Sequence, residues 1–483
     1  MTEKAVKGYE CKFVTYIPNK DPYRDDYYIV KENIHYTDGS IKPNIRVIKN
    51  YQRPFWVTKK SYQNHQSKKE WEKKDRLTEF RCKDSEFGRK VAKALGKEYL
   101  TDQSIRSLSR SPYLYGTDIK STSLIKHDYS VKFPDLVTNN TICAFDIETD
   151  VSDDNMGKVI IISACMKDKV VCVINKDFIL GIPDVERKVR EKISKYIGDY
   201  IDKRKMKVYI EIESGELKTI QKVFEYIHKW KPDFLSIWNI NFDLPKIVEA
   251  LQRNGVDPAD VFSDPSLPDH LKYFYYREGP SIKVKANGDT ISLKPADRWH
   301  VAKCSSSFYF IDAMCVYRLV RLGIQEKPSY SLDSILDEEL GIRKLSFKEA
   351  DNYSGLQKHR FLQTNYKAEY IVYNIFDTIS MLELEEKTND LSQSISVISG
   401  FSDFSNFNSQ PRRIVDQLHF DMLELDHVMG STADNIREDV DDQTLPLTGW
   451  IITLAPHLIV DNGISMISED KNIKSNVRLY VSD

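Results

Sequence analysis

The stretch from Thr141 to Asp150 reads TICAFDIETD and constrains the chain more than any other part of the sequence. An apolar run typical of a buried strand ends in Asp146 and Glu148, which are separated by one residue. Successive side chains of a strand alternate between its faces, so both carboxylates project from the same face, about 7 Å apart. Two carboxylates on one rigid edge suit hard cations such as Mg²⁺ or Mn²⁺.

Two later segments complete this pattern, which would be weak alone in a sequence with 72 acidic residues. Asp243 stands where a predicted strand (234–238) meets the start of a helix that runs through Leu251. Tyr373 and Asp377 are four residues apart on a predicted helix (366–386) and therefore share one face. Hydrolysis of a phosphodiester requires charge neutralisation, an activated water and a stabilised leaving oxygen. Two divalent ions held by clustered carboxylates supply all three.

These motifs resemble the three exonuclease motifs of the DEDDy 3′–5′ exonucleases, and in particular the proofreading domain of family B DNA polymerases. The motifs are FDIET, then N-x-x-F-D, then Y-x-x-x-D, in this order. The sequences PSYSLD (328–333) and YNI-x-D (373–377) are most similar to the T-even-type bacteriophage polymerases. The resemblance covers nearly the whole chain, and the hairpin predicted over 281–294 resembles the strand-separating hairpin of that family.

The resemblance implies a role for each matching residue. Asp146, Glu148 and Asp377 would bind one Mg²⁺ or Mn²⁺ ion, with Asp146 bridging to a second ion and Asp243 acting on that second ion. Tyr373 would position the nucleophile. The residues implied to bind the terminal 3′ nucleotide of DNA are Asn239 and Phe242.

The first palm motif of such polymerases, D-x-x-S-L-Y-P-S, is absent from the sequence, although Asp483 could be the first palm carboxylate. We therefore expect the chain to be one half of a split polymerase. A second polypeptide would carry palm, fingers and thumb and could contact a sliding clamp. DNA primer–template and a single-stranded 3′ end are the expected substrates.

The expected fold is α/β (α+β) and has three parts. Residues 1–135 would form a β-rich N-terminal domain, in which 68–76 and 87–95 are predicted helical. Residues 136–388 would form an RNase H-like exonuclease core, a mixed sheet flanked by helices, which begins with an antiparallel meander over 141–174. Residues 389–483 would form a connector and the beginning of the palm domain, with a strand-like run at 448–460.

Composition is ordinary for a soluble globular protein and argues neither for nor against nucleic acid. The chain has 70 basic and 72 acidic residues, 41% hydrophobic residues, and seven cysteines without a C-x-x-C pair. An odd number of cysteines, several of them within apolar runs, favours reduced thiols in a cytoplasmic protein. No segment approaches the ~18 apolar residues of a membrane span, so no membrane partner is expected.

Two other functions remain open from the sequence alone. A stand-alone DEDD exonuclease acting on RNA or DNA would need neither the long N-terminal domain nor the residues after Asp377. A non-catalytic subunit that binds primer–template would not need four intact carboxylates. Asp312, at the end of its own predicted strand, is favoured as a structural or supporting acid.

Overall fold

The computed structural model describes residues 5–19, 21–101, 103–153, 155–284, 288–324 and 326–432, and the backbone of 464–465 and 478–479. The predictions made for Asp483 and for the strand-like run 448–460 lie outside the described residues. Two short strands pair in the last part, β19 (Ile464–Ser465) and β20 (Arg478–Leu479).

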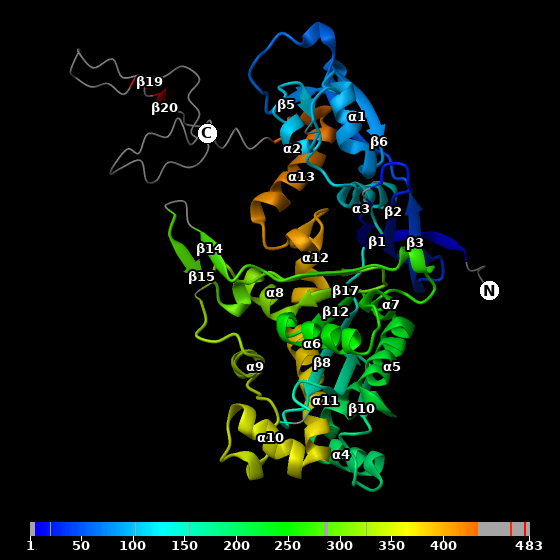
Figure 1. The fold of residues 1–483 in the computed structure, drawn as a ribbon, viewed down its shortest axis with the longest axis vertical. Coiled ribbons are helices and arrows are strands. Elements are labelled where there is room, and N and C mark those ends of the chain that lie inside the picture. Colours follow the sequence, from blue (N-terminus) through cyan, green and yellow to red (C-terminus); the bar gives the residue numbers. More distant parts are fainter. Residues whose placement is uncertain are drawn as a thin grey trace.

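The N-terminal part is rich in strands, as predicted, and occupies the blue end of the molecule in Figure 1. Two three-stranded sheets have the orders β1-β2-β3 and β6-β4-β7. The elements of this part are β1 (Val6–Ile17), β2 (Tyr27–Tyr36), β3 (Ile41–Lys49), β4 (Arg53–Thr58), β5 (Trp71–Lys73), β6 (Leu77–Cys82), β7 (Leu114–Tyr115), α1 (Phe87–Ala94), α2 (Ile105–Leu108) and α3 (Ser121–Lys132).

The helix predicted over 68–76 is wrong. This segment forms strand β5 and a 3₁₀ turn (Lys74–Arg76). Strand β5 pairs with β18 (His427–Met429), which comes some 350 residues later in the chain, and Glu72 between its two exposed neighbours is buried. Long-range pairing thus overrides the local preference of a charged, polar segment, which is weak by comparison.

The central part is an eight-stranded mixed sheet flanked by helices, which confirms the predicted α/β fold of the RNase H-like kind. Its strand order is β11-β10-β9-β8-β12-β17-β16-β13. Strands β8, β9 and β10 form the predicted antiparallel meander, whereas β12 lies parallel to β8 on the other side. The strands are β8 (Ile142–Thr149), β9 (Val159–Met166), β10 (Lys169–Asn175), β11 (Lys207–Glu213), β12 (Phe234–Ile237), β13 (Phe274–Arg277), β16 (Val301–Cys304) and β17 (Tyr309–Asp312).

Helices cover both faces of this sheet (Figure 1). Side chains of β8 alternate between the two cores: Cys143, Phe145 and Ile147 pack with α5 and α6, whereas Ala144 packs with α4 and α11. The helices of this part are α4 (Val185–Arg204), α5 (Gly215–Trp230), α6 (Ile240–Arg253), α7 (Pro258–Phe262), α8 (Ala313–Val320), α9 (Leu332–Leu340), α10 (Gly355–Asn365) and α11 (Lys367–Thr388).

The hairpin predicted around residue 288 is present as β14 (Ile282–Val284) and β15 (Thr290–Ser292), which pair antiparallel. After α11 the chain continues through α12 (Ile395–Ser399) and α13 (Gln410–Glu424). Strand β18 then joins β5, so the segment after the central part returns to the N-terminal part. In Figure 1, α13 accordingly lies among the N-terminal elements. No helix in the described part of the chain is long and apolar enough to cross a bilayer.

A buried ion pair joins β2 to the start of β12. Lys31, with no exposed surface, places its Nζ 3.5 Å from Oδ1 of Asp233 and donates to the carbonyl of Lys231 at 2.8 Å. The second carboxylate oxygen of Asp233 accepts the N–H and hydroxyl of Thr141, just before β8. The N-terminal part is therefore held to the residues just before β8, the strand that carries Asp146.

Replacing Lys31 with Ala should lower the free energy of unfolding by about 3–5 kcal/mol, because the Asp233 carboxylate would stay buried without its cation. Denaturant unfolding at pH 7 measures this change. The matched control is Lys42→Ala, at an exposed position on β3. A loss below about 1 kcal/mol for Lys31→Ala, the size typical of surface pairs, would contradict this account of the interface.

Candidate active site

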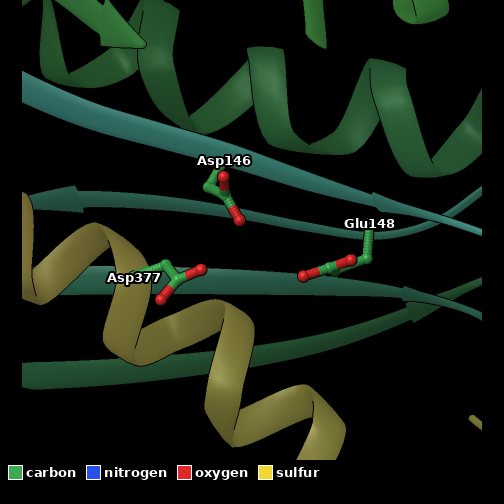
Figure 2. Close-up of side chains that lie close together, drawn as sticks. All are labelled: Asp146, Glu148 and Asp377. Carbon is green, nitrogen blue, oxygen red and sulfur yellow. The ribbon is translucent and has the colours of Figure 1, made fainter. Parts of the chain in front are cut away.

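Strand β8 presents its two acids to helix α11. Asp146 and Glu148 follow Ala144 at two-residue spacing, so they share the face that packs on α11. Figure 2 shows the carboxylates of Asp146, Glu148 and Asp377 directed into one space between the strand and the helix. One carboxylate oxygen from each of the three lies within 4.8 Å of the others.

Helix α11 turns a polar face toward this strand. Tyr370, Tyr373, Asn374 and Asp377 recur at three- and four-residue spacing and so lie along one side of the helix. Asn374 donates from Nδ2 to Oδ2 of Asp146 at 2.6 Å, and the Tyr370 hydroxyl donates to Oε2 of Glu148. Two of the three acids thus have a hydrogen-bond donor from α11.

Asp243 lies near enough to Asp146 and Glu148 to feel their charges, but it is not among the three acids whose oxygens lie within 4.8 Å of one another. It lies in the first turn of α6, is 4% exposed, and its pKa is raised well above its ordinary value by burial and by the charges of Asp146 and Glu148. Helix α6 begins at Ile240, earlier than predicted, so Pro245 sits in the second turn, where it has no N–H to offer the carbonyl of Asn241.

A buried acid holds the junction from which Asp243 projects. Oδ2 of Asp312 accepts the N–H of Ile240 at 3.0 Å, and its Oδ1 caps α8 by accepting the N–H of Cys315 at 2.9 Å. This agrees with the structural role expected of Asp312. Asn239, which precedes α6, adopts a left-handed conformation (φ 71°), and the Phe242 ring beside Asp243 is 54% exposed.

The crowding of acids alters their protonation. Burial, followed by the charge of Asp377, raises the pKa of Asp146 to about 7. Burial and the Asp146 charge raise the pKa of Glu148 well above its ordinary value, and burial also raises the pKa of Asp377. Burial and the Asp377 charge raise the pKa of Tyr373, so its phenol stays neutral. The site therefore binds protons readily at neutral pH when nothing else offsets its negative charge.

Lys344 is the cation of the site, and the sequence patterns did not single it out. Its Nζ lies 2.6 Å from Oδ2 of Asp377 and 3.4 Å from the Tyr373 hydroxyl. Burial opposes its charge, yet Asp377, Tyr373 and Asp146 together raise the pKa of Lys344 well above its ordinary value. The ammonium thus remains charged and offsets part of the acidic cluster.

The position of Lys344 follows from the segment PSYSLD. Ser331 caps helix α9, which ends at Gly341 in a left-handed conformation that favours glycine. The chain then folds back, so that Oδ1 of Asp333 accepts the N–H of Lys344 at 2.9 Å. In the sequence, only Asp333 of the PSYSLD segment points toward this arrangement. Lys344 lies 33 residues before Asp377, and no local pattern connects the two.

The donor atoms present fit a divalent cation. All three clustered side chains offer carboxylate oxygens, the ligands that Mg²⁺ and Mn²⁺ prefer. Oδ1 of Asp377 is buried and has no hydrogen-bond partner, although buried polar atoms are rarely left unpaired. Asp146, Glu148 and Asp377 could therefore hold a metal ion. Fold and site together define a nuclease-like acidic centre on an RNase H-like sheet.

Comparison with known proteins points to the same class. Residues 103–261 match the family model described as DNA polymerase family B, exonuclease domain. The match includes Asp146, Glu148 and Asp243 but ends before α11. It supports an exonuclease domain of the family B polymerase type and indicates 3′–5′ exonuclease activity on DNA. No curated protein matches the chain.

Replacing Asp146 with Asn should stabilise the metal-free protein, and more so as the pH rises. The folded-state pKa of Asp146, about 7, exceeds its ordinary value of 3.8. Deprotonation therefore costs the folded state stability between about pH 4 and pH 7, and the cost is complete above pH 7. Thermal unfolding in EDTA should show a gain on the order of 4 kcal/mol at pH 8, because each pKa unit corresponds to about 1.4 kcal/mol.

The same gain in stability should become much smaller near pH 4, where residue 146 is neutral in the folded wild type as well as in the variant. Asp168→Asn, at an exposed turn, serves as the control and should change stability little at either pH. A gain for Asp146→Asn that does not depend on pH would mean that the charge of Asp146 is not its source.

Proposed function

We propose that this chain is the 3′–5′ proofreading exonuclease part of a family B replicative DNA polymerase. The observation that carries this proposal is the convergence of Asp146, Glu148 and Asp377 within 4.8 Å between the interior strand β8 and helix α11. Asp243, buried and electrostatically coupled to the same acids, supports a fourth position. The family match over residues 103–261 supports DNA as the substrate.

In this proposal the four carboxylates hold two divalent ions, Mg²⁺ or Mn²⁺. Such ions neutralise the attacked phosphate, activate water and stabilise the leaving 3′-oxygen. Asp146, Glu148 and Asp377 form one site, and Asp146 and Asp243 the second. The raised pKa values of the free acids favour this assignment, because bound cations would replace the protons that now offset their charge.

The other side chains orient the substrate and balance charge. Tyr373 is neutral and can donate a hydrogen bond to the attacking water or to a phosphate oxygen without adding charge. Lys344 pairs with the Asp377 carboxylate beside the Tyr373 phenol, where its charge can offset negative charge that develops in the site. The exposed ring of Phe242, next to Asp243, offers a surface on which the terminal base can stack, and Asn239 lines the same junction.

DNA synthesis is assigned in this proposal to a partner polypeptide with palm, fingers and thumb, and contact with a sliding clamp would pass through that partner. The described residues supply the exonuclease elements only. Resemblance of PSYSLD and YNI-x-D to T-even-type phage sequences supports a phage-type polymerase. Co-purification of a second polypeptide that adds nucleotides to a primer would test the split arrangement, and synthesis by this chain alone would contradict it.

Single-stranded DNA labelled at its 5′ end tests the exonuclease directly. With Mg²⁺ the chain should give a ladder of products shortened from the 3′ end, and EDTA should abolish it. Asp146→Ala and Asp243→Ala should each lower the rate by orders of magnitude, because a ligand of the proposed ions is lost. Asp168→Ala is the matched surface control. Retained activity in either site variant would refute the assignment of that residue.

Lys344→Met should lower kcat on the same substrate by on the order of 100-fold, because the cation that pairs with Asp377 and contacts Tyr373 is removed. The KM for DNA should change little, since Lys344 contacts the acids of the site and not the exposed surface. Lys348→Met, an exposed neighbour, is the control. A change confined to KM would instead indicate that Lys344 binds DNA in the ground state.

A further inference from the structure

Helix α11 lies in register with strand β8 along the acidic site. Four residues of a helix rise about 6 Å, close to the rise of two residues of a strand, about 6.6 Å. Asn374 contacts Asp146, and Tyr370, four residues earlier, contacts Glu148, two residues later. Each acid of β8 is therefore matched by one hydrogen-bond donor of α11.

The Tyr370 hydroxyl is at the centre of a buried hydrogen-bond network. It donates to Oε2 of Glu148, while Nε2 of Gln363 lies 3.2 Å and Nδ1 of His359 2.8 Å from its oxygen. When Glu148 is ionised the phenol proton goes to its carboxylate, so the two nitrogens donate to the phenol oxygen and His359 carries its proton on Nδ1. Tyr370 has no exposed surface, so this geometry is fixed by packing.

Gln363 extends the network to the backbone that carries the acids. Its Nε2 also donates to the carbonyl of Thr149 at 2.8 Å, and its Oε1 accepts the N–H of Val151 at 3.1 Å. These two backbone groups belong to the last residue of β8 and the loop behind it. One side chain of α10 thus fixes the end of the strand and the phenol that holds Glu148.

The ring of Tyr370 also packs beside Tyr373, the residue proposed to orient the nucleophile. It lies parallel to the ring of Tyr373, with an interplanar angle of 3° and centroids 6.0 Å apart. The imidazole of His359 meets both rings edge-on. A shift of Tyr370 would therefore move the Glu148 carboxylate and the Tyr373 phenol together.

We propose that Tyr370 is a positioning residue that sets the Glu148 carboxylate for a divalent cation and aligns the Tyr373 ring, with Gln363 fixing its hydroxyl. This inference rests on the proposed function, in which Glu148 is a ligand and Tyr373 orients the nucleophile. Polar groups that hold metal ligands in place change metal affinity or activity by about 10–100-fold when they are removed.

Tyr370→Phe in the full chain removes the hydroxyl and keeps the ring. Titration with Mn²⁺ alone, followed by calorimetry and electron paramagnetic resonance, should show affinity weakened by about 10-fold or more. On single-stranded DNA, kcat should fall while the KM for DNA stays unchanged, and excess Mn²⁺ should restore part of the rate. Tyr366→Phe, four residues earlier beside Phe361, is the matched control and should leave Mn²⁺ affinity, kcat and KM as in the wild type.

Wild-type Mn²⁺ affinity and kcat in Tyr370→Phe would overturn the inference, as would equal losses in Tyr366→Phe. If Tyr370→Phe fails to fold, Gln363→Met decides by the same readouts, with a loss in the same direction required. A wild-type chain that binds Mn²⁺ but cuts no DNA would refute the proposed function, while the Mn²⁺ comparison would still decide the role of Tyr370. A wild-type chain that binds no Mn²⁺ would refute both.

Discussion

The fold has to hold together four acids that repel one another, namely Asp146, Glu148, Asp243 and Asp377. Burial raises the pKa values of all four acids, and the charges of neighbouring acids of the site raise those of Asp146, Glu148 and Asp243 further. The arrangement persists because the acids project from elements fixed elsewhere. Apolar clusters cover both faces of the sheet, and their burial contributes free energy that does not depend on the charge of the site.

Local contacts then reduce the repulsion at defined atoms. Asn374 and Tyr370 donate to Asp146 and Glu148, and Lys344 contributes a full positive charge beside Asp377. The cluster is therefore partly balanced by the protein itself, yet Oδ1 of Asp377 is left without a partner. This incomplete balance distinguishes a site suited to a cation from a buried acidic pair that is fully satisfied by its neighbours.

Much of the central fold could be predicted because its patterns are local. The meander β8-β9-β10 reads directly from runs of β-branched residues separated by short polar turns, and strand alternation alone places Asp146 and Glu148 on one face. Tyr373 and Asp377 likewise lie on one side of α11, as predicted, because a helix has a fixed period. Asp243 was placed correctly at a strand–helix junction, although α6 begins before the residue that looked like its start.

Other features depend on contacts between distant segments and left no local signal. Strand β5 exists because residues 427–429 pair with it, and the charged sequence of 68–76 by itself resembles a helix. Helix α4 escaped prediction because its many charges obscure the apolar stripe of Val189, Ile193 and Ile197. Lys344 reaches the site through a turn fixed by Asp333, so only the folded chain shows that its ammonium belongs with Asp377.

The buried pair of Lys31 and Asp233 has a consequence for dissecting the chain. A fragment trimmed to the central sheet would keep the hydrogen bonds from Thr141 to Asp233 but would lose the Lys31 ammonium that faces this carboxylate. Strand β1 also contacts the segment before β8. Glu10 accepts the N–H of Thr138 at 2.9 Å, and Lys12 donates to the carbonyl of Thr138 at 2.5 Å. Removing the N-terminal part would break these contacts and expose Asp233 and the segment before β8 to water, so the central part should be produced together with β1 and β2.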